Sequence, residues 1–273
     1  MEDKFTLEDK VLQDSLAAVG SYSQKPQNQY KLLVLGGIAN QLYAYPAFAN
    51  LMRPTTDLDL VANSPITYAA FRHELGRSLA QKLEKYNPEI KPRSHHTFQL
   101  SLKDQDGDPL LIHIYRRSIN RYNLEKNSIE RQFSNANRLQ IPNTSSAVYI
   151  LRTEDLLEQK IGVFSRLKRL ERLHKIPKEF KELYEKIKKR DWIALANQDI
   201  NSWLSELKKE KTRLPSHYDH GHEAFQEALD HYCSFKDIFD ICLLLKLAVN
   251  NSIDFDEDYL TKITEEEKRI VQG

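Results

Sequence analysis

Short apolar segments separated by turn residues characterise the first 150 positions of the chain. A β-strand is predicted where apolar and polar residues alternate, or where a short apolar run is bounded by glycine, proline or aspartate. Six segments fit, at 30–35, 57–62, 98–102, 110–115, 138–141 and 147–151. Helical spacing of apolar residues predicts helices at roughly 7–19, 38–51 and 65–86, and Pro46 is expected to kink or divide the second. Asp106-Gly107 predicts a hairpin turn between two of the strands.

The pattern changes at Thr153, after which it is almost wholly helical. Glu154 and Asp155 follow Thr153 and place acids in the first turn of the predicted helix, where the helix dipole favours them. The predicted fold class is therefore α+β, with a mixed sheet and its helices followed by a helical domain. We expect a polar and helical lead-in at 1–29, a mixed α/β domain at 30–152 and a helical domain at 153–273.

Composition narrows the class of protein. Of 273 residues, 40% are hydrophobic and 29% are charged, which is typical of a water-soluble globular protein. The longest apolar segment, 238–249, contains two charged residues and falls short of the ~20 residues that span a bilayer, so no membrane partner is expected. Cys233 and Cys242 lie roughly 13 Å apart along one predicted helix and cannot bridge each other. A reduced, cytoplasmic setting is the expectation.

Charge is unevenly distributed although the net charge is only +1. Twelve Lys or Arg residues and four Glu residues fall between Lys160 and Arg190, whereas 254–267 holds seven acids and one Lys. Such a basic stretch can contact phosphates. A solvated helix face with ion pairs between successive turns accounts for it at least as well.

Two glycines and two aspartates form the pattern that points to chemistry. Gly36-Gly37 separates a predicted strand from a predicted helix, and Asp57 and Asp59 begin the next strand. Glycines there allow close approach of a phosphate to the backbone, and the helix N-terminus offers unpaired N–H groups to an anion. Side chains at i and i+2 of a strand share a face, so the two carboxylates lie side by side and suit Mg²⁺ with a nucleoside triphosphate. The alternative is a plain turn followed by a polar strand end.

The residues resemble a known superfamily. Leu35-Gly-Gly-Ile38 followed by Arg53-Pro-Thr-Thr-Asp-Leu-Asp-Leu60 is similar to the polymerase-β-type nucleotidyltransferases, and within them to the AbiEii and MenT group of toxin nucleotidyltransferases. Thr153-Glu-Asp-Leu-Leu-Glu-Gln-Lys-Ile161 resembles that group's helix with a functional lysine, and Lys236-Asp-Ile-Phe-Asp240 resembles its Lys-Asp-x-x-Asp motif. The likeness runs in order over roughly 30–248.

The resemblance implies a set of roles. Residues 30–152 become the nucleotidyltransferase catalytic domain, and 153–273 contributes the Lys and Asp motifs. The implied catalytic residues are Asp57, Asp59, Lys160 and Asp237, with Asp57 and Asp59 also holding the metal. The implied nucleotide-binding residues are Gly36, Gly37, Arg53 and Thr56. For Arg53, a cap at a helix end is an equally good interpretation.

The activity implied is Mg²⁺-dependent transfer of a nucleoside monophosphate from an NTP to a macromolecular acceptor. The 3′ end of tRNA is the leading acceptor, and the biological role would be the toxin of a toxin–antitoxin pair with an antitoxin protein as partner. The spacer between Gly37 and Asp57 is nineteen residues, longer than the family pattern, and His113 occupies the expected position of a third carboxylate. These departures are the grounds for an alternative, a weak or inactive nucleotide-binding protein on the same fold. Transfer to a protein or a small molecule is a further alternative.

A histidine cluster offers a competing site. His217, His220 and His222 lie near Asp219, which raises the possibility of zinc. Their spacing lacks the i, i+4 register of helical metalloprotease sites, so a polar surface loop is the favoured interpretation.

Overall fold

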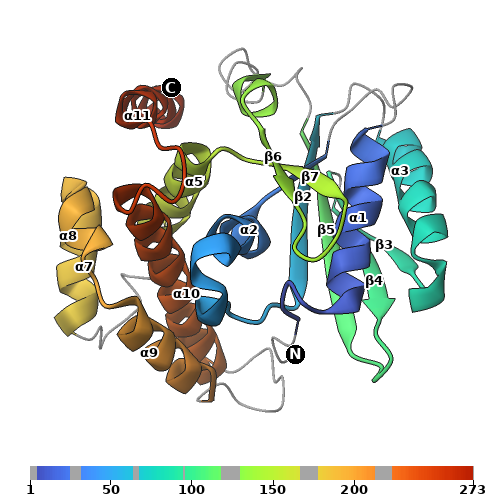
Figure 1. Cartoon of the computed structure of the whole chain (residues 1–273), viewed down its shortest axis with the longest axis horizontal. Coiled ribbons are helices and arrows are strands. Elements are labelled where there is room, and N and C mark those ends of the chain that lie inside the picture. The colour runs from blue at the N-terminus through green and yellow to red at the C-terminus, as the bar shows by residue number, and fades with distance from the viewer. Residues whose placement is uncertain are drawn as a thin grey trace.

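The computed structural model describes residues 5–24, 32–63, 68–94, 96–117, 130–166, 178–212 and 223–272. Its centre is a seven-stranded sheet with the order β3-β4-β5-β2-β1-β7-β6 (Figure 1). The strands are β1 (Leu32–Val34), β2 (Asp57–Asn63), β3 (Glu89–Ser94), β4 (Thr97–Lys103), β5 (Pro109–Arg117), β6 (Asn137–Gln140) and β7 (Ala147–Ile150). All six predicted strands are present, to within a few residues at their ends.

The sheet is mixed. β2 runs parallel to β5 and antiparallel to β1, and β1 runs parallel to β7. β3, β4 and β5 form an antiparallel meander, and the hairpin between β4 and β5 turns at Gly107, which has a φ of +83°. The short β1 is buried on both sides because it lies in the middle of the sheet.

β3 is not among the strands predicted from the sequence. This strand is exposed at the edge of the sheet, and its sequence, Glu-Ile-Lys-Pro-Arg-Ser, has neither an apolar run nor a β-branched majority. Pro92 is tolerated there because an edge strand has unpaired N–H positions. The strand forms because β4 offers it a partner, a tertiary cause that local propensity does not contain.

Helices account for most of the remaining described residues. They are α1 (Lys10–Ser23), α2 (Gly36–Phe48), α3 (Tyr68–Lys82), α5 (Thr153–Arg166), α7 (Lys178–Lys189), α8 (Trp192–Ala196), α9 (Ile200–Thr212), α10 (Glu223–Val249) and α11 (Glu257–Gln272), with short 3-10 turns at Ala49–Leu51 and Glu84–Tyr86. Two predictions of helix bounds were wrong. α2 begins at the glycines rather than at Ile38, and α1 extends four residues beyond Val19. Pro46 lies inside α2 near its end, where the helix gives way to a 3-10 turn.

Two helical layers enclose the sheet (Figure 1). α1 and α3 cover one side, where the ring of Phe71 on α3 meets that of Phe98 on β4 edge-on at 5.6 Å. Leu58 and Leu60 of β2 are fully buried towards the same side. α2, α5 and α10 lie on the other side of β2, so the two aspartates of that strand face these helices.

The C-terminal helices are arranged around α10, a 27-residue helix with a fully buried centre that contains Ile238 and Cys242. Figure 1 shows α8 and α9 lying along it. In the described parts of the chain, no helix combines the length and apolar content needed to cross a bilayer. The fold class predicted from the sequence, α+β with a mixed sheet and a helical C-terminal region, is confirmed.

Candidate active site

The two aspartates of β2 project from the same side of the sheet. Leu58 lies between Asp57 and Asp59 in sequence and points into the core, as alternation along a strand requires. Asp57 accepts a hydrogen bond from the hydroxyl of Thr55 at 2.7 Å, and Asp59 accepts one from the phenol of Tyr115 on β5 at 3.4 Å. Each carboxylate thus has a hydroxyl donor, and the side chain of Asp59 remains 27% exposed.

Their electrostatic environments differ. Burial and then the neighbouring charge of Asp57 raise the pKa of Asp59 to about 6, although the cations of Lys160 and Lys236 act in the opposite direction. Burial would also raise the pKa of Asp57, but the charge of Lys236 and the hydrogen bond from Thr55 outweigh it and lower the pKa. Two carboxylates that repel each other strongly enough to shift a pKa form a place where a cation is stabilised.

The donor set fits part of a Mg²⁺ shell. Mg²⁺ binds in proteins through one or two carboxylates, with substrate phosphates and water completing an octahedron, and Asp57 and Asp59 provide that number. Within the described residues, no group of three or more His, Cys, Asp or Glu side chains is arranged to hold a metal. His113 lies beside the pair, with its Nδ1 3.7 Å from a carboxylate oxygen of Asp59. Burial lowers the pKa of His113, which favours a neutral imidazole.

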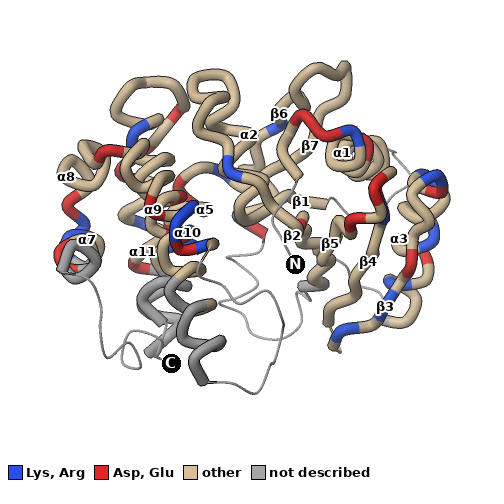
Figure 2. Tube along the Cα trace, turned by 90° about the horizontal axis from the view of Figure 1, so that it is seen from below, with Lys and Arg blue, Asp and Glu red and all other residues tan. Residues whose placement is uncertain are grey.

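Gly36 occupies a backbone conformation that side chains disfavour. Its φ is +63°, and a Cβ atom there would lie 2.9 Å from Oδ2 of Asp59. The absence of a side chain at Gly36 therefore allows α2 to begin close to the carboxylate of Asp59. The N-cap residue, Leu35, provides no side-chain hydrogen bond, and α2 carries no charged residue, as Figure 2 also shows. The first N–H groups of the helix are thus available to an anion.

At position 37 the absence of a side chain matters because Arg53 approaches the backbone closely. A Cβ atom there would lie 2.4 Å from Nη2 of Arg53, whose guanidinium packs against the backbone of the helix. Arg53 is only 4% exposed and forms two hydrogen bonds to Asp240 of α10, at 3.2 Å from Nε and 2.9 Å from Nη2. The structure therefore places this arginine beneath the start of α2, in a buried ion pair.

Thr56 lies in the bend that leads into β2, and its carbonyl accepts the N–H of Leu111 at 2.9 Å. It helps to set the register of β2 against β5. The neighbouring Thr55 makes the contact to Asp57, a role that the sequence analysis did not assign. A threonine two residues before a functional aspartate is a recognisable signal, because Ser and Thr hydroxyls form such local bonds.

Lys160 joins the ion pair of Arg53 to a second aspartate. Its Nζ lies 2.8 Å from Oδ1 of Asp237 and 2.8 Å from Oδ2 of Asp240. We refer to Arg53, Lys160, Asp237 and Asp240 as the buried ion cluster. Burial alone would lower the pKa of Lys160, but the two carboxylates, Asp240 first, raise it above the ordinary value. The helices α5 and α10 thereby bring two residues implied by the resemblance, Lys160 and Asp237, into direct contact.

Lys236 is the other cation near the aspartates. Its charge lowers the pKa of both Asp57 and Asp59, and its ammonium lies 5.4 Å from the centre of the Tyr232 ring one turn earlier on α10. In the sequence this lysine stands out only as part of the Lys-Asp-x-x-Asp motif, and no role was predicted for it. Its position next to Asp237 in the sequence could have indicated a role, because adjacent residues of a helix lie on the same turn.

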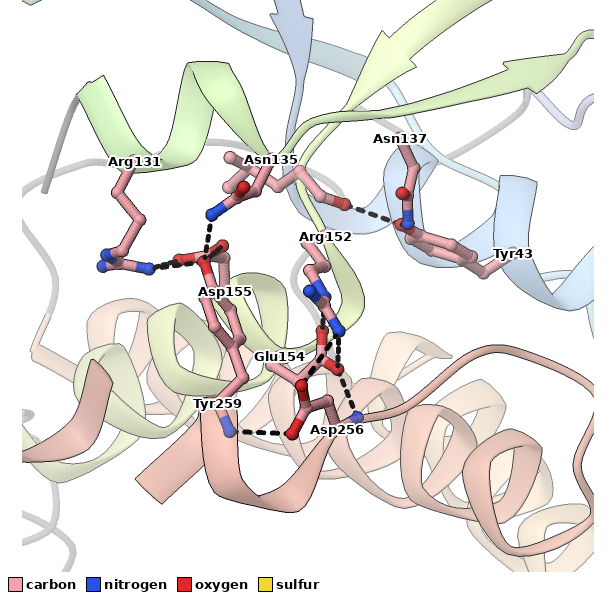
Figure 3. A network of polar contacts seen from close by, with 10 residues as sticks. Tyr43, Arg131, Asn135, Asn137, Arg152, Glu154, Asp155, Asp256 and Tyr259 are labelled. Atoms are coloured by element: carbon pink, nitrogen blue, oxygen red, sulfur yellow. Dashed lines mark hydrogen bonds and ion pairs between the residues drawn. The ribbon is translucent and has the colours of Figure 1, made fainter. Parts of the chain in front are cut away.

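A second polar network fixes the beginning of α5 (Figure 3). It comprises Arg131, Asn135, Arg152, Glu154, Asp155, Asp256 and Tyr259, with Tyr43 and Asn137 alongside. The fully buried carboxylate of Glu154 accepts hydrogen bonds from Arg152 at 2.9 Å and from the backbone N–H of Asp256 at 2.6 Å. Tyr259 donates to Asp155 at 2.9 Å, and its ring lies under the Arg152 guanidinium at 4.5 Å. These contacts tie α11 to the first turn of α5, the helix that carries Lys160.

Other candidates fall elsewhere. His217, His220 and His222 lie outside the described residues, as does 167–177 of the basic stretch. The two cysteines lie in α10, as predicted, with Cys242 buried and Cys233 half-buried.

The fold and the site together define an α+β protein in which a glycine-initiated helix stands over paired strand carboxylates. No family model matches the sequence, and no curated protein matches it. Solved structures do. An antigenic nucleotidyltransferase-like protein from Paracoccidioides brasiliensis is 17% identical, over 59% of this chain and 69% of that one, with a TM-score of 0.38. A tRNA-processing enzyme in an apo form is 13% identical over 98% of this chain, which spans 65% of that one, with a TM-score of 0.32.

The nucleotidyltransferase toxin MenT4 from Mycobacterium tuberculosis also matches. It is 12% identical, the match covers 96% of this chain and 89% of that one, and the TM-score is 0.35. The matched structures are thus two nucleotidyltransferase-like proteins, one of them a toxin, and a tRNA-processing enzyme.

Proposed function

We propose that this chain is a nucleotidyltransferase that moves a nucleoside monophosphate from an NTP to an acceptor hydroxyl. The observation that carries the proposal is the position of Gly36. Its positive φ starts α2 within contact distance of Asp59, so a phosphate at the helix N-terminus meets a cation held by the two carboxylates. A plain turn followed by a polar strand end requires neither this contact nor the raised pKa.

The roles proposed for the residues are supported by where the residues lie. Asp57 and Asp59 would hold Mg²⁺, which when bound would supply positive charge to neutralise the phosphates. The first N–H groups of α2 bind triphosphate oxygens. The acceptor oxygen forms a bond to the α-phosphorus while the bond to the β-phosphate oxygen breaks, pyrophosphate leaves, and the hydroxyl proton passes to a base.

The helical region contributes cations. The charge of Lys236 acts on both aspartates and is the strongest cationic influence on Asp57, so Lys236 is suited to binding the triphosphate. Lys160 acts on the charge of Asp59 from within the buried ion cluster, where Asp237 and Asp240 hold its ammonium. In this arrangement Asp237 orients Lys160. The resemblance implies that Asp237 acts as a base or a metal ligand, and either role requires the ammonium of Lys160 to move away from Asp237.

The finer proposals concern the acceptor and the biology. The acceptor is the 3′ end of tRNA, the chain acts in the cytoplasm as the toxin of a toxin–antitoxin pair, and an antitoxin protein is its partner. The sequence resemblance and the basic stretch at 160–190 support these proposals.

A second candidate function is nucleotide binding without transfer. It is favoured by His113, which pairs in register with Asp59 at the position where the resemblance expects a third carboxylate. Both candidate functions include NTP binding, so only a measurement of nucleotide transfer distinguishes them.

The test is a transfer assay with each α-labelled NTP, Mg²⁺ and total tRNA. The double variant Asp57→Asn/Asp59→Asn is compared with Asp106→Asn, the same chemical change at an exposed hairpin turn that accepts Asn-Gly as readily as Asp-Gly. We expect labelled tRNA from the wild type and from Asp106→Asn, and none from the double variant. Equal labelling by the double variant would refute the assignment of the site. Binding of NTP without label on tRNA, protein or a small molecule would establish the second candidate.

A further inference from the structure

The side of the sheet that carries the aspartates continues outward as a row of polar residues. Asp59 of β2 pairs with His113 of β5, and His113 pairs with Gln99 of β4. Residues paired across strands point to the same side of a sheet, so these three side chains share the side opposite α3. Two more residues extend the row. Tyr115 lies two residues after His113 on β5, and Arg93 lies on the edge strand β3. We call these five residues the polar sheet face.

This face carries partly exposed side chains where the opposite side is closed. The phenylalanine at 98 is fully buried under α3, whereas Tyr115 is 37% exposed and His113 keeps 27% of its side chain exposed. Tyr115 is one of the few large apolar side chains in the described residues with that much exposure. Its ring stands next to Asp59, to which its hydroxyl donates a hydrogen bond. An exposed aromatic ring adjoining a transfer site is a surface on which a base can stack.

Arg93 is held in place at the outer end of the face. The residue is exposed, yet its Nε–H donates to the side-chain oxygen of Gln99 at 2.5 Å, and Gln99 is only 2% exposed. Among the described residues Arg93 forms no ion pair, and because the residue is exposed, part of its guanidinium remains accessible to a ligand. A buried amide that orients an exposed guanidinium reduces the entropy lost when the fork binds a phosphate. By strand spacing, β3 lies about 14 Å from β2, a span of a few nucleotides.

We propose that the polar sheet face seats the 3′-terminal segment of a single-stranded nucleic acid, with its last base on Tyr115 and a backbone phosphate on Arg93. The inference rests on the proposed function, because that function places the reacting phosphate at Asp57 and Asp59. It names where the acceptor lies and which residues select it. A nucleic acid fits better than a protein acceptor, since stacking and phosphate contact are what an exposed ring and an oriented guanidinium provide.

The test measures binding and transfer with the full chain. Fluorescence anisotropy of a 5′-labelled single-stranded RNA with a free 3′-hydroxyl gives Kd without NTP. Arg93→Glu is compared with Arg77→Glu, the same charge reversal at an exposed residue of α3 on the other side of the sheet. We expect Arg93→Glu to raise Kd tenfold or more and to flatten its salt dependence, with Arg77→Glu within twofold of wild type. Tyr115→Ala is expected to weaken binding about tenfold and Tyr115→Phe to preserve it.

The outcomes separate this inference from the proposed function. Equal Kd values for Arg93→Glu and Arg77→Glu overturn the polar sheet face as an acceptor site. Transfer to RNA with an unchanged acceptor KM in Arg93→Glu overturns it too, while leaving the nucleotidyltransferase standing. RNA binding that depends on Arg93 and Tyr115, without transfer by the wild type, supports the surface and refutes the proposed activity. Labelling of a protein alone, undiminished in Arg93→Glu, shows that the acceptor belongs to another class.

Discussion

Replacing Asp240 by asparagine tests the energetic role of the buried ion cluster. Asp240 is 1% exposed and neutralises two cations, accepting two hydrogen bonds from Arg53 and lying 2.8 Å from Lys160. The variant removes the carboxylate charge that the two buried cations share and leaves Lys160 with Asp237. Removing one partner from a buried ion pair costs about 3–5 kcal/mol, a large share of the roughly 5–15 kcal/mol that stabilises a domain. With an m-value of about 3 kcal/mol/M, the urea midpoint should fall by about 1–1.7 M.

Urea unfolding followed by circular dichroism measures this change. Asp106→Asn, at an exposed turn, is the control, and its midpoint should correspond to within about 0.5 kcal/mol of wild type. A loss below about 1 kcal/mol for Asp240→Asn would mean that the cluster is hydrated or replaceable, and the reasoning from burial would be wrong.

The dependence of stability on pH gives an independent measure of the buried ion cluster. Burial alone would raise the pKa of Asp240, but the charges of Arg53 and Lys160 outweigh it and hold the pKa well below its ordinary value of 3.8. A carboxyl whose pKa is lower in the folded state contributes stability that is complete above its unfolded pKa. That contribution is lost as the pH falls towards the folded value. Wild-type stability should therefore decline below about pH 4, and Asp240→Asn should lack this part of the decline.

Three further predictions concern single positions. Gly37→Ala places a Cβ atom 2.4 Å from Nη2 of Arg53 and should lower the free energy of unfolding by about 1–3 kcal/mol, so an unchanged melting temperature would contradict the packing. Gln41 is 2% exposed, and its amide has no hydrogen-bond partner in the part of the chain that the structure describes; Gln41→Met should therefore stabilise the fold by about 1–2 kcal/mol, and a loss of stability would show that the amide is satisfied. Burial raises the pKa of Cys242 to about 12, so in the native protein a thiol reagent should modify only Cys233, and modification of both before unfolding would count against the structure of α10.

The sequence predicted best what depends on neighbours along the chain. The alternation of 57–62 predicted β2 and the shared face of its two aspartates, and the Asp-Gly turn predicted the β4–β5 hairpin. The sequence did not predict β3, which exists because β4 offers it a partner. It placed the start of α2 two residues late, because glycine disfavours helix interiors but not a first position with positive φ.

The residues of the candidate site likewise divide into those that local sequence patterns predict and those whose positions depend on tertiary packing. Gly36, Gly37, Asp57 and Asp59 stand in local patterns, so their adjacency was predictable. The engagement of Arg53 by Asp240 depends on how α10 packs against α2, and no local pattern encodes it. The positions of the functional residues follow from the structure, whereas their roles, and a domain boundary after residue 152, stay predictions.

The pairing of Arg53 with Asp240 spans 187 positions and has a consequence for synthesis. At an elongation rate of about 5–20 residues per second, roughly ten to forty seconds separate the two residues on the ribosome. Throughout that interval the guanidinium lacks its counter-ion, and Lys160, which shares that carboxylate, also waits for α10. The sheet cannot close over this charge at low cost until α10 has emerged. A nascent chain that ends before α10 therefore leaves the N-terminal end of α2 without this support, and the candidate site is completed only when most of the protein has been made.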